Sequence, residues 1–335
     1  MDLSVGTPVD PTPAVVREAL AAASDAPGYP LTAGTPAVRA AAAGYLARRH
    51  GVAGLAADAV LPTIGSKELV ALLPTLLGLG PGDQVVVPEI AYPTYDVGAR
   101  LAGADPVRSD GLAGLGPARA GLVWVNSPSN PTGRVLPPEH LRKVVDWARE
   151  RGAVVASDEC YLDFGWEEQP RSILHPAACG GSHDGVLAVH SLSKRSNLAG
   201  YRAGFVAGDP RLVAELLAVR KHAGLMVPKP VQAAMVAALS DDAHVEQQRA
   251  RYAARRLALR TALQAAGFAV HHSAAGLYLW ATRGEDCWST VDDLAADGIL
   301  AAPGAFYGPA GARHVRIALT ATDERVAAAV TRLTR

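Results

Sequence analysis

Short apolar runs alternate with longer amphipathic stretches through the first two thirds of the chain. Four runs have the composition of strands that are covered on both faces, and they lie at 84–87, 122–125, 153–156 and 186–189. Three other stretches carry apolar side chains at helical spacing, and they lie at 36–50, 66–77 and 138–151. This strand–helix alternation predicts an α/β domain with a largely parallel sheet.

The pattern changes near residue 240. Residues 241–266 predict one long helix rich in arginine, and three strand-like runs with helical patterns between and after them follow, at 269–271, 276–280 and 314–318. We therefore expect a smaller α+β unit. Because Asp241, Asp242 and Glu246 begin the same helix, its arginines indicate a solvated face rather than a nucleic-acid-binding stripe.

Composition limits the function classes. At about 150 residues per domain, the length predicts two domains. Lys+Arg and Asp+Glu both number 32, and this neutral balance argues against a non-specific carrier of nucleic acid or of anionic membrane. The three cysteines, Cys160, Cys179 and Cys287, are too few and too widely spaced for a disulfide framework. With no apolar leader and no run of 18 apolar residues, a cytoplasmic protein is expected.

One cysteine lies in a possible metal-binding pattern, because His175, Cys179 and His183 are spaced by four. Pro176 and neighbouring glycines interrupt the stretch, and no fourth ligand is evident. We therefore expect a surface loop and no metal site.

Polar residues follow the predicted strands between residues 126 and 204. Asp158 follows the run at 153–156, and Ser191, Ser193 and Lys194 follow the run at 186–189, with Arg202 soon after. Ligands of open α/β sheets bind at these strand ends. Two hydroxyls and a guanidinium suit a phosphate dianion. A lysine and a carboxylate beside such a site, without a nucleotide-binding loop, indicate pyridoxal phosphate, which needs a lysine for covalent attachment and an acidic partner for its ring nitrogen.

These motifs carry a family resemblance. The segments 130–133 (Asn-Pro-Thr-Gly), 158–161, 191–194 and 202–204 resemble, in order and separation, those of the class I/II pyridoxal-phosphate-dependent aminotransferases of the aspartate aminotransferase fold. The similarity extends over essentially the whole chain. Segments 3–10, 63–68 and 190–202 further resemble the actinobacterial N-succinyldiaminopimelate aminotransferases, which act in lysine and diaminopimelate biosynthesis.

The resemblance implies a fold type I architecture: a large domain with a mostly parallel seven-stranded sheet and a smaller α+β domain. The expected division is discontinuous, with residues 31–240 forming the large cofactor-binding domain and residues 1–30 and 241–335 forming the small one. A homodimer is expected. Relatives carry an N-terminal arm ahead of Gly6, and here that arm is expected to be missing or reduced to five residues.

The resemblance also assigns roles to residues. Lys194 is the cofactor-bearing lysine and proton shuttle, Asp158 the partner of the ring nitrogen, and Tyr161 a partner of the ring oxygen. The other implied cofactor contacts are made by Ser66, Lys67, Tyr92, Asn130, Ser191, Ser193, Arg202 and, from the partner subunit, Tyr29. The implied substrate contacts are made by Arg316, Gly6 and Asn130.

The implied reaction is a ping-pong transfer of an amino group from glutamate to a 2-oxo acid, expected to be N-succinyl-2-amino-6-oxopimelate. Charge alone marks Arg195, Lys67 and the cluster at 220–222 as candidates to bind its distal carboxylate. The alternatives are an aminotransferase of alanine, aromatic or aspartate type, a fold-related lyase, and a non-catalytic protein on the same fold.

Overall fold

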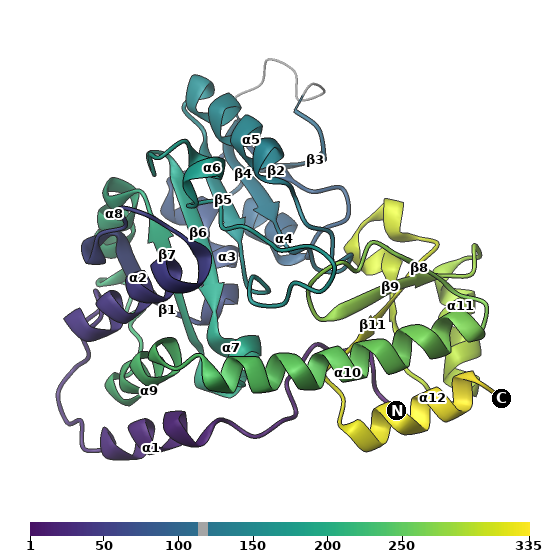
Figure 1. Ribbon diagram of the computed structural model, residues 1–335. Helices are drawn as coiled ribbons and strands as arrows, with labels where there is room; N and C mark the ends of the chain where they lie inside the picture. The colour runs from purple at the N-terminus through teal and green to yellow at the C-terminus, as the bar shows by residue number, and fades with distance from the viewer. Residues whose placement is uncertain (113–119) are drawn as a thin grey trace.

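A seven-stranded sheet forms the centre of the computed structural model, which describes residues 1–112 and 120–335 (Figure 1). The strand order is β1-β7-β6-β5-β4-β2-β3, with parallel pairing from β6 to β3 and antiparallel pairing of β7 with both β6 and β1. The mostly parallel sheet is thus confirmed. Its strands are β1 (Val60–Ile64), β2 (Gln84–Val87), β3 (Asp105–Arg108), β4 (Ala120–Asn126), β5 (Val154–Asp158), β6 (Val186–Ser191) and β7 (Ala203–Gly208).

Helices cover both faces of this sheet. In β4, Leu122 and Trp124 point to one face, while Val123 and Val125 point to the other, and all four side chains are buried. This two-sided burial is why the strand runs are continuously apolar. The first face packs on α3 (Gly65–Leu76), α4 (Thr94–Leu101) and α8 (Pro210–Arg220). The second packs on α1 (Ala14–Ala22), α2 (Pro36–His50), α5 (Pro138–Arg151), α6 (Pro176–Cys179) and α9 (Lys229–Ser240).

A second, antiparallel sheet forms in the C-terminal third, with strand order β10-β11-β9-β8. Its strands are β8 (Ala269–His271), β9 (Tyr278–Thr282), β10 (Ala302–Pro303) and β11 (Val315–Ala318). The helices that pack on it are α10 (Ala243–Ala265), α11 (Cys287–Ala296) and α12 (Asp323–Leu333). Figure 1 shows α10 running from beside α7 (Leu192–Arg195) across to this sheet. The expected α+β unit is therefore present.

Short 3₁₀ helices connect several of these elements. They are Ala57–Ala59, Ala199–Tyr201, Gly304–Tyr307 and Pro309–Gly311. No helix within residues 1–112 and 120–335 is long and apolar enough to span a membrane.

The N-terminal segment contacts the small sheet and also packs into the core of the large sheet. Leu3 N donates to Leu300 O over 2.9 Å and Leu3 O accepts from Ala318 N over 2.7 Å, which joins it to the small sheet. Further along, α1 packs through Val16 into the core that α9 shares with the large sheet. The division of the chain at residues 30 and 240 stays a prediction.

Two local expectations are corrected. The arginines of α10 do not all form a solvated face: Arg255 is 3 % exposed and pairs with Asp10 and Asp323, because this helix binds the N-terminal segment and α12. The expected loop around Cys179 contains the short helix α6. The Nδ1 atom of His175 accepts from Ala177 N at the start of this helix, and Cys179 is buried.

Candidate active site

A cavity of about 350 Å³ opens at the carboxyl ends of β4, β5 and β6, where residues of the small sheet face the large one. It brings together twelve of the thirteen predicted site residues. They are Gly6, Ser66, Lys67, Tyr92, Asn130, Asp158, Tyr161, Ser191, Ser193, Lys194, Arg202 and Arg316. The thirteenth, Tyr29, is 97 % exposed and lies outside this lining, and its action on a partner subunit stays a prediction.

Asp158 is the last residue of β5, so its buried carboxylate lies at the carboxyl end of this strand, at the edge of the large sheet that borders the cavity. Its Oδ2 accepts from the Tyr95 hydroxyl over 2.8 Å, and its Oδ1 accepts from Cys160 N over 3.2 Å. Burial raises the pKa of Asp158, although these hydrogen bonds oppose the shift. Within the described ranges no lysine, arginine or histidine forms an ion pair with it. A buried carboxylate in a cavity without a cationic partner fits a ligand that brings a protonated nitrogen.

Asn126 fixes two of the predicted residues. It ends β4 directly opposite Asp158 in the sheet register. Its Nδ2 donates to Asp158 O over 2.9 Å, and its Oδ1 accepts from Asn130 N over 2.7 Å. A side chain that bridges these two backbone groups holds the loop containing Asn130 against the end of β5.

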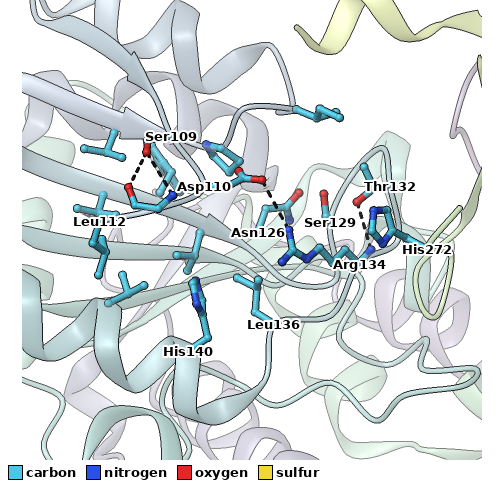
Figure 2. Close-up of a pocket in the computed structure, with 18 residues that line it drawn as sticks. Ser109, Asp110, Leu112, Asn126, Ser129, Thr132, Arg134, Leu136, His140 and His272 are labelled. Carbon is cyan, nitrogen blue, oxygen red and sulfur yellow. Dashed lines mark hydrogen bonds and ion pairs between the residues drawn. The ribbon is translucent and has the colours of Figure 1, made fainter. Parts of the chain in front are cut away.

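The far side of the same loop borders a second, smaller cavity of about 120 Å³ (Figure 2). Figure 2 shows Asn126 and Ser129 on one side of Arg134, whose Nη1 lies 3.6 Å from Asp110 Oδ2. None of the described residues that line this cavity is a predicted site residue. The chemistry therefore concentrates in the larger cavity.

Lys194 enters the larger cavity from α7, a single turn that directly follows β6. The turn is fixed at its start, where Ser191 Oγ accepts from Ser193 N over 3.1 Å. It is also fixed behind the lysine, because Arg195 Nε donates to the buried Asp163 over 2.9 Å. Among the described residues, the Lys194 side chain has no hydrogen bond or ion pair, so its amine is available to a ligand.

A cradle suited to a phosphate group lies beside this lysine. Helix α3 begins at Gly65, so the backbone N–H groups of Ser66 and Lys67 lie in its first turn and point outward without intrahelical partners. Gly65 has φ +70°, and a Cβ there would overlap the Arg202 guanidinium. A Cβ on Gly204 would come within 2.9 Å of Gly65 C and 3.0 Å of Ser66 N.

Arg202 itself adopts a left-handed backbone conformation, with φ +56°. A non-glycine residue holds this conformation at some cost, and such strain concentrates at functional sites. Its Nη1 donates to Ala199 O over 2.7 Å, which leaves the other nitrogens of the fork to the cavity. Together with the hydroxyls of Ser66, Ser191 and Ser193, this donor set fits a dianionic phosphate.

Arg316 reaches the opposite wall of the cavity from β11 and is 7 % exposed. Its Nη1 donates to Asn130 Oδ1 over 2.9 Å, and its Nη2 donates to Ser4 O. Each terminal nitrogen of a guanidinium carries two protons, so one proton on each remains. Two such donors match the two oxygens of a carboxylate.

Tyr278, which the sequence reasoning did not single out, lies between the two walls. Its hydroxyl is 3.0 Å from the hydroxyl of Tyr161, and its ring centroid is 4.1 Å from the Arg316 guanidinium carbon. Burial raises the pKa of Tyr161, and the neighbouring Tyr278 adds to the shift. Gly6 packs on the same hydroxyl, and a Cβ at Gly6 would overlap it. A larger residue at this position would therefore displace the Tyr278 side chain.

The remaining wall consists of Tyr92, Lys67 and Cys160. Lys67 Nζ lies 5.8 Å from the Tyr92 ring centroid, and Cys160 Sγ donates to Ser66 Oγ over 3.2 Å. Burial raises the pKa of the Cys160 thiol, so this thiol is neutral and suited to contact rather than to nucleophilic attack.

The other residues that the sequence reasoning missed are Tyr95 and Asn126. Tyr95 stacks on Trp124 with ring centroids 4.9 Å apart and donates to Asp158, which lies far along the chain. No local sequence pattern indicates that contact. Asn126 did leave a signal, because it is a polar residue that ends an otherwise apolar strand at the ligand-binding edge.

Comparison with known proteins places this cavity in context. The sequence pattern of the family described as "Aminotransferase class I and II" matches residues 1–333. A protein named "Probable aminotransferase Rv1178" from Mycobacterium tuberculosis is 69% identical over 334 residues, which cover 100% of this chain and 80% of that protein. The "4-dedimethylamino-4-oxo-anhydrotetracycline transaminase OxyQ" of Streptomyces rimosus is 64% identical over 334 residues, which cover 100% of this chain and 93% of that protein.

Solved structures match the whole fold. An aminotransferase from Staphylococcus aureus superposes with a TM-score of 0.92 at 27% identity, covering 100% of this chain and 93% of that chain. A structure titled as a probable N-succinyldiaminopimelate aminotransferase from Thermus thermophilus superposes with a TM-score of 0.88 at 33% identity, covering 100% of this chain and 94% of that chain. The two-sheet architecture is therefore that of aminotransferases.

Proposed function

Because this chain belongs to the class I and II aminotransferases, whose cofactor is pyridoxal phosphate, we propose that Lys194 carries that cofactor in the cavity described above. When bound, the cofactor supplies a ring that holds the electrons left after the substrate loses its α-proton. The observation that carries the assignment is that one cavity is lined by Lys194, by the phosphate cradle and by the buried Asp158, which has no ion-pair partner among the described residues.

In this proposal a carboxylate holds the ring-nitrogen end of the cofactor, and positively charged and N–H groups hold its phosphate end. Asp158 keeps the ring nitrogen protonated, and that proton compensates the carboxylate which is otherwise buried without a cation. Arg202 and the first turn of α3 bind the phosphate, with hydroxyls contributed by Ser66, Ser191 and Ser193. Tyr92 would pack against the ring, and the Tyr161 hydroxyl and the Asn130 amide would donate hydrogen bonds to its oxygen.

The substrate is held and deprotonated by this chain's own residues. The two remaining N–H groups of Arg316 bind the α-carboxylate, and Gly6 lets the N-terminal segment lie close to it. Lys194 Nζ takes the proton from the substrate's α-carbon and returns it on the cofactor side. In the first half-reaction glutamate would leave its amino group on the cofactor-loaded enzyme and depart as 2-oxoglutarate. In the second, a 2-oxo acid takes that amino group.

We propose N-succinyl-2-amino-6-oxopimelate as the acceptor, which makes the enzyme one of lysine and diaminopimelate biosynthesis. The similarity to the Thermus structure of that title supports this acceptor. Of the candidates for its distal carboxylate, Arg195 is occupied by Asp163 and Arg220 by Glu68. Lys67 lines the cavity and makes no ion pair among the described residues, so we assign that role to its side chain.

A second acceptor is favoured by a separate observation. The transaminase named for 4-dedimethylamino-4-oxo-anhydrotetracycline is 64% identical, which is a far closer sequence match than the Thermus protein. A ring ketone of that kind has no α-carboxylate for Arg316. The two acceptors therefore make opposite demands on this residue.

We further propose a cytoplasmic homodimer in which Tyr29, exposed on one subunit, reaches the phosphate of the other. Sedimentation at micromolar concentration measures the mass directly. A monomer that retains full activity would contradict the dimer.

The acceptor is tested by a panel in which the cofactor-loaded protein uses glutamate as donor. The acceptors are N-succinyl-2-amino-6-oxopimelate, the oxo-anhydrotetracycline, pyruvate and oxaloacetate, and 2-oxoglutarate formation is measured. We expect the succinylated acceptor to give the highest kcat/KM. Higher kcat/KM with pyruvate or oxaloacetate would contradict the proposal, and higher kcat/KM with the tetracycline would select the second acceptor. Lys194→Ala is the control, since it abolishes turnover with every acceptor.

A further inference from the structure

Tyr278 lies where the cofactor side and the substrate side of the cavity meet. In the small sheet Arg316 is opposite Trp280 and Ala318 is opposite Tyr278. Because residues directly opposite each other share a face, and side chains alternate along a strand, Tyr278 and Arg316 emerge diagonally from the same face. Leu277 and Leu279, which flank Tyr278 in the sequence, point to the opposite face and are fully buried. Strand register therefore places the tyrosine ring beside the guanidinium.

The ring of Tyr278 forms a platform for Arg316. The guanidinium carbon lies 4.1 Å from the Tyr278 ring centroid and 5.1 Å from that of Tyr307. Arg316 Nε is buried and has no hydrogen-bond partner within the described ranges. Since hydrogen bonds hold only the two terminal nitrogens, contact with the ring faces fixes the remaining orientation of the plane.

The hydroxyl of Tyr278 makes a different contact. Its partner among the described residues is the Tyr161 hydroxyl at 3.0 Å, and Tyr278 is 4 % exposed. Each phenol has one proton. The geometry allows either hydroxyl to donate, and both residues line the cavity. Donation from Tyr278 to Tyr161 leaves the Tyr161 proton for the cavity.

We propose that Tyr278 is a positioning residue that acts on both sides of the reaction, an inference that rests on the roles proposed above for Tyr161 and Arg316. Its ring orients Arg316 toward the substrate carboxylate. Its hydroxyl donates to Tyr161 and thereby makes Tyr161 a stronger donor to the cofactor's ring oxygen, since hydrogen bonds in a chain polarise one another. The two effects belong to different atoms of one side chain and are separable by substitution.

The first test removes the hydroxyl and keeps the ring. A donor to the ring oxygen draws negative charge from it, so a weaker donor raises the pKa of the neighbouring Lys194 nitrogen in the loaded protein. Tyr278→Phe is expected to raise the pH midpoint of the visible absorbance by about half a unit. Tyr161→Phe is expected to shift this midpoint in the same direction by a larger amount. The KM for glutamate stays within about twofold, because the platform remains.

The second test removes the ring as well. Tyr278→Leu is expected to raise the same midpoint and also to raise the KM for glutamate about tenfold. Tyr307→Phe is the matched control for the midpoint, because its ring also lies over Arg316 while no hydrogen bond of its hydroxyl occurs among the described residues. It leaves the midpoint unchanged.

Thermal unfolding of the cofactor-free variants separates positioning from folding. A merely structural role predicts a lower Tm for both Tyr278 variants with the pH midpoint and the KM both unmoved, and that result overturns the proposal. An unchanged midpoint in Tyr278→Phe, when Tyr161→Phe shifts it, overturns the hydroxyl contact. An unchanged KM in Tyr278→Leu overturns the platform. If Tyr161→Phe leaves the midpoint unmoved, or Arg316→Lys leaves the KM for glutamate unmoved, the proposed roles fail and this inference fails with them.

Discussion

Arg316 Nη1 donates to Asn130 Oδ1 over 2.9 Å, and this hydrogen bond joins the small sheet to the loop that follows β4 of the large sheet. Asn130 is itself held by Asn126, which also binds the backbone of Asp158. A chain of three hydrogen bonds thus fixes the proposed carboxylate clamp relative to the proposed partner of the cofactor's ring nitrogen. Substrate and cofactor are positioned by one connected set of side chains.

Arg316→Lys tests the clamp. Lysine keeps the positive charge but lacks the planar fork that donates to Asn130, Ser4 and a carboxylate together. We expect the KM for glutamate to rise about a hundredfold, as for losing a charged, two-point hydrogen bond. The visible absorbance of the loaded protein should stay, because the phosphate cradle is intact. Loss of that absorbance, or an unchanged KM, would show that Arg316 does not act on the substrate.

Asp158→Asn separates stability from function. Burial raises the pKa of Asp158 in the folded, cofactor-free protein. A group whose folded pKa is raised binds protons more tightly when folded, so stability falls as pH rises from its unfolded pKa through its folded pKa. Above that range the ionised carboxylate destabilises the protein. We expect Asp158→Asn to raise the Tm of the cofactor-free protein at pH 8 by about 2–4 °C, and to reduce turnover sharply once cofactor is added.

Tyr95→Phe is the control for this measurement. It removes the hydroxyl that donates to Asp158 Oδ2 over 2.8 Å while keeping the carboxylate, so it should lower the Tm of the cofactor-free protein. A Tm that falls in Asp158→Asn as well would mean that the carboxylate's hydrogen bonds outweigh its desolvation.

Lys67→Gln tests the distal carboxylate. Glutamate has a second carboxylate and alanine has none, so the variant should raise the KM for glutamate about tenfold and leave that for alanine within about twofold. Single-turnover loss of the visible band measures each amino donor separately. Lys221→Gln, on an exposed residue outside this cavity, is the matched control. Equal effects on both donors would assign Lys67 to the cofactor instead.

The residues that sequence reasoning found share a local signature. Asp158, Ser191, Ser193 and Lys194 all follow apolar runs directly, and the carboxyl ends of neighbouring parallel strands meet at one edge of a sheet. The four strands of the large sheet and the three helices that the pattern predicted were predictable for the same reason, since each is a continuous apolar or periodic segment. The pattern of apolar residues did not predict β7, because Ala203, Gly204 and Gly208 weaken its apolar run.

Contacts between distant segments left no such signature. Tyr278 lies in an apolar strand, where it is indistinguishable in sequence from a core aromatic, and only the register with β11 places it beside Arg316. The buried Arg255 likewise looked solvated, because its partners Asp10 and Asp323 come from opposite ends of the chain.

Asp163 supplies a test of what holds the lysine-bearing turn. Its Oδ2 accepts from Arg195 Nε and from the Tyr45 hydroxyl, each over 2.9 Å, and its Oδ1 accepts from Arg49 Nε over 3.0 Å. Burial opposes ionisation of this carboxyl, but Arg195, His50 and Arg49 outweigh burial and hold its pKa below its ordinary range. A depressed folded pKa contributes stability that is present above the unfolded pKa and lost as pH falls.

Asp163→Asn leaves the buried Arg195 without its carboxylate. We expect the free energy of unfolding at pH 7 to fall by about 3–5 kcal/mol, as for breaking a buried ion pair, measured by urea denaturation of the cofactor-free protein. The difference from the unaltered protein should shrink below about pH 4, where an unfolded aspartate is protonated. Asp146→Asn, in the exposed pair with Arg142, is the control and should change the free energy by less than about 1 kcal/mol. A loss at pH 7 as small as the control's would mean that the other acceptors of Arg195, Ala238 O and Ser196 Oγ, are sufficient to hold it.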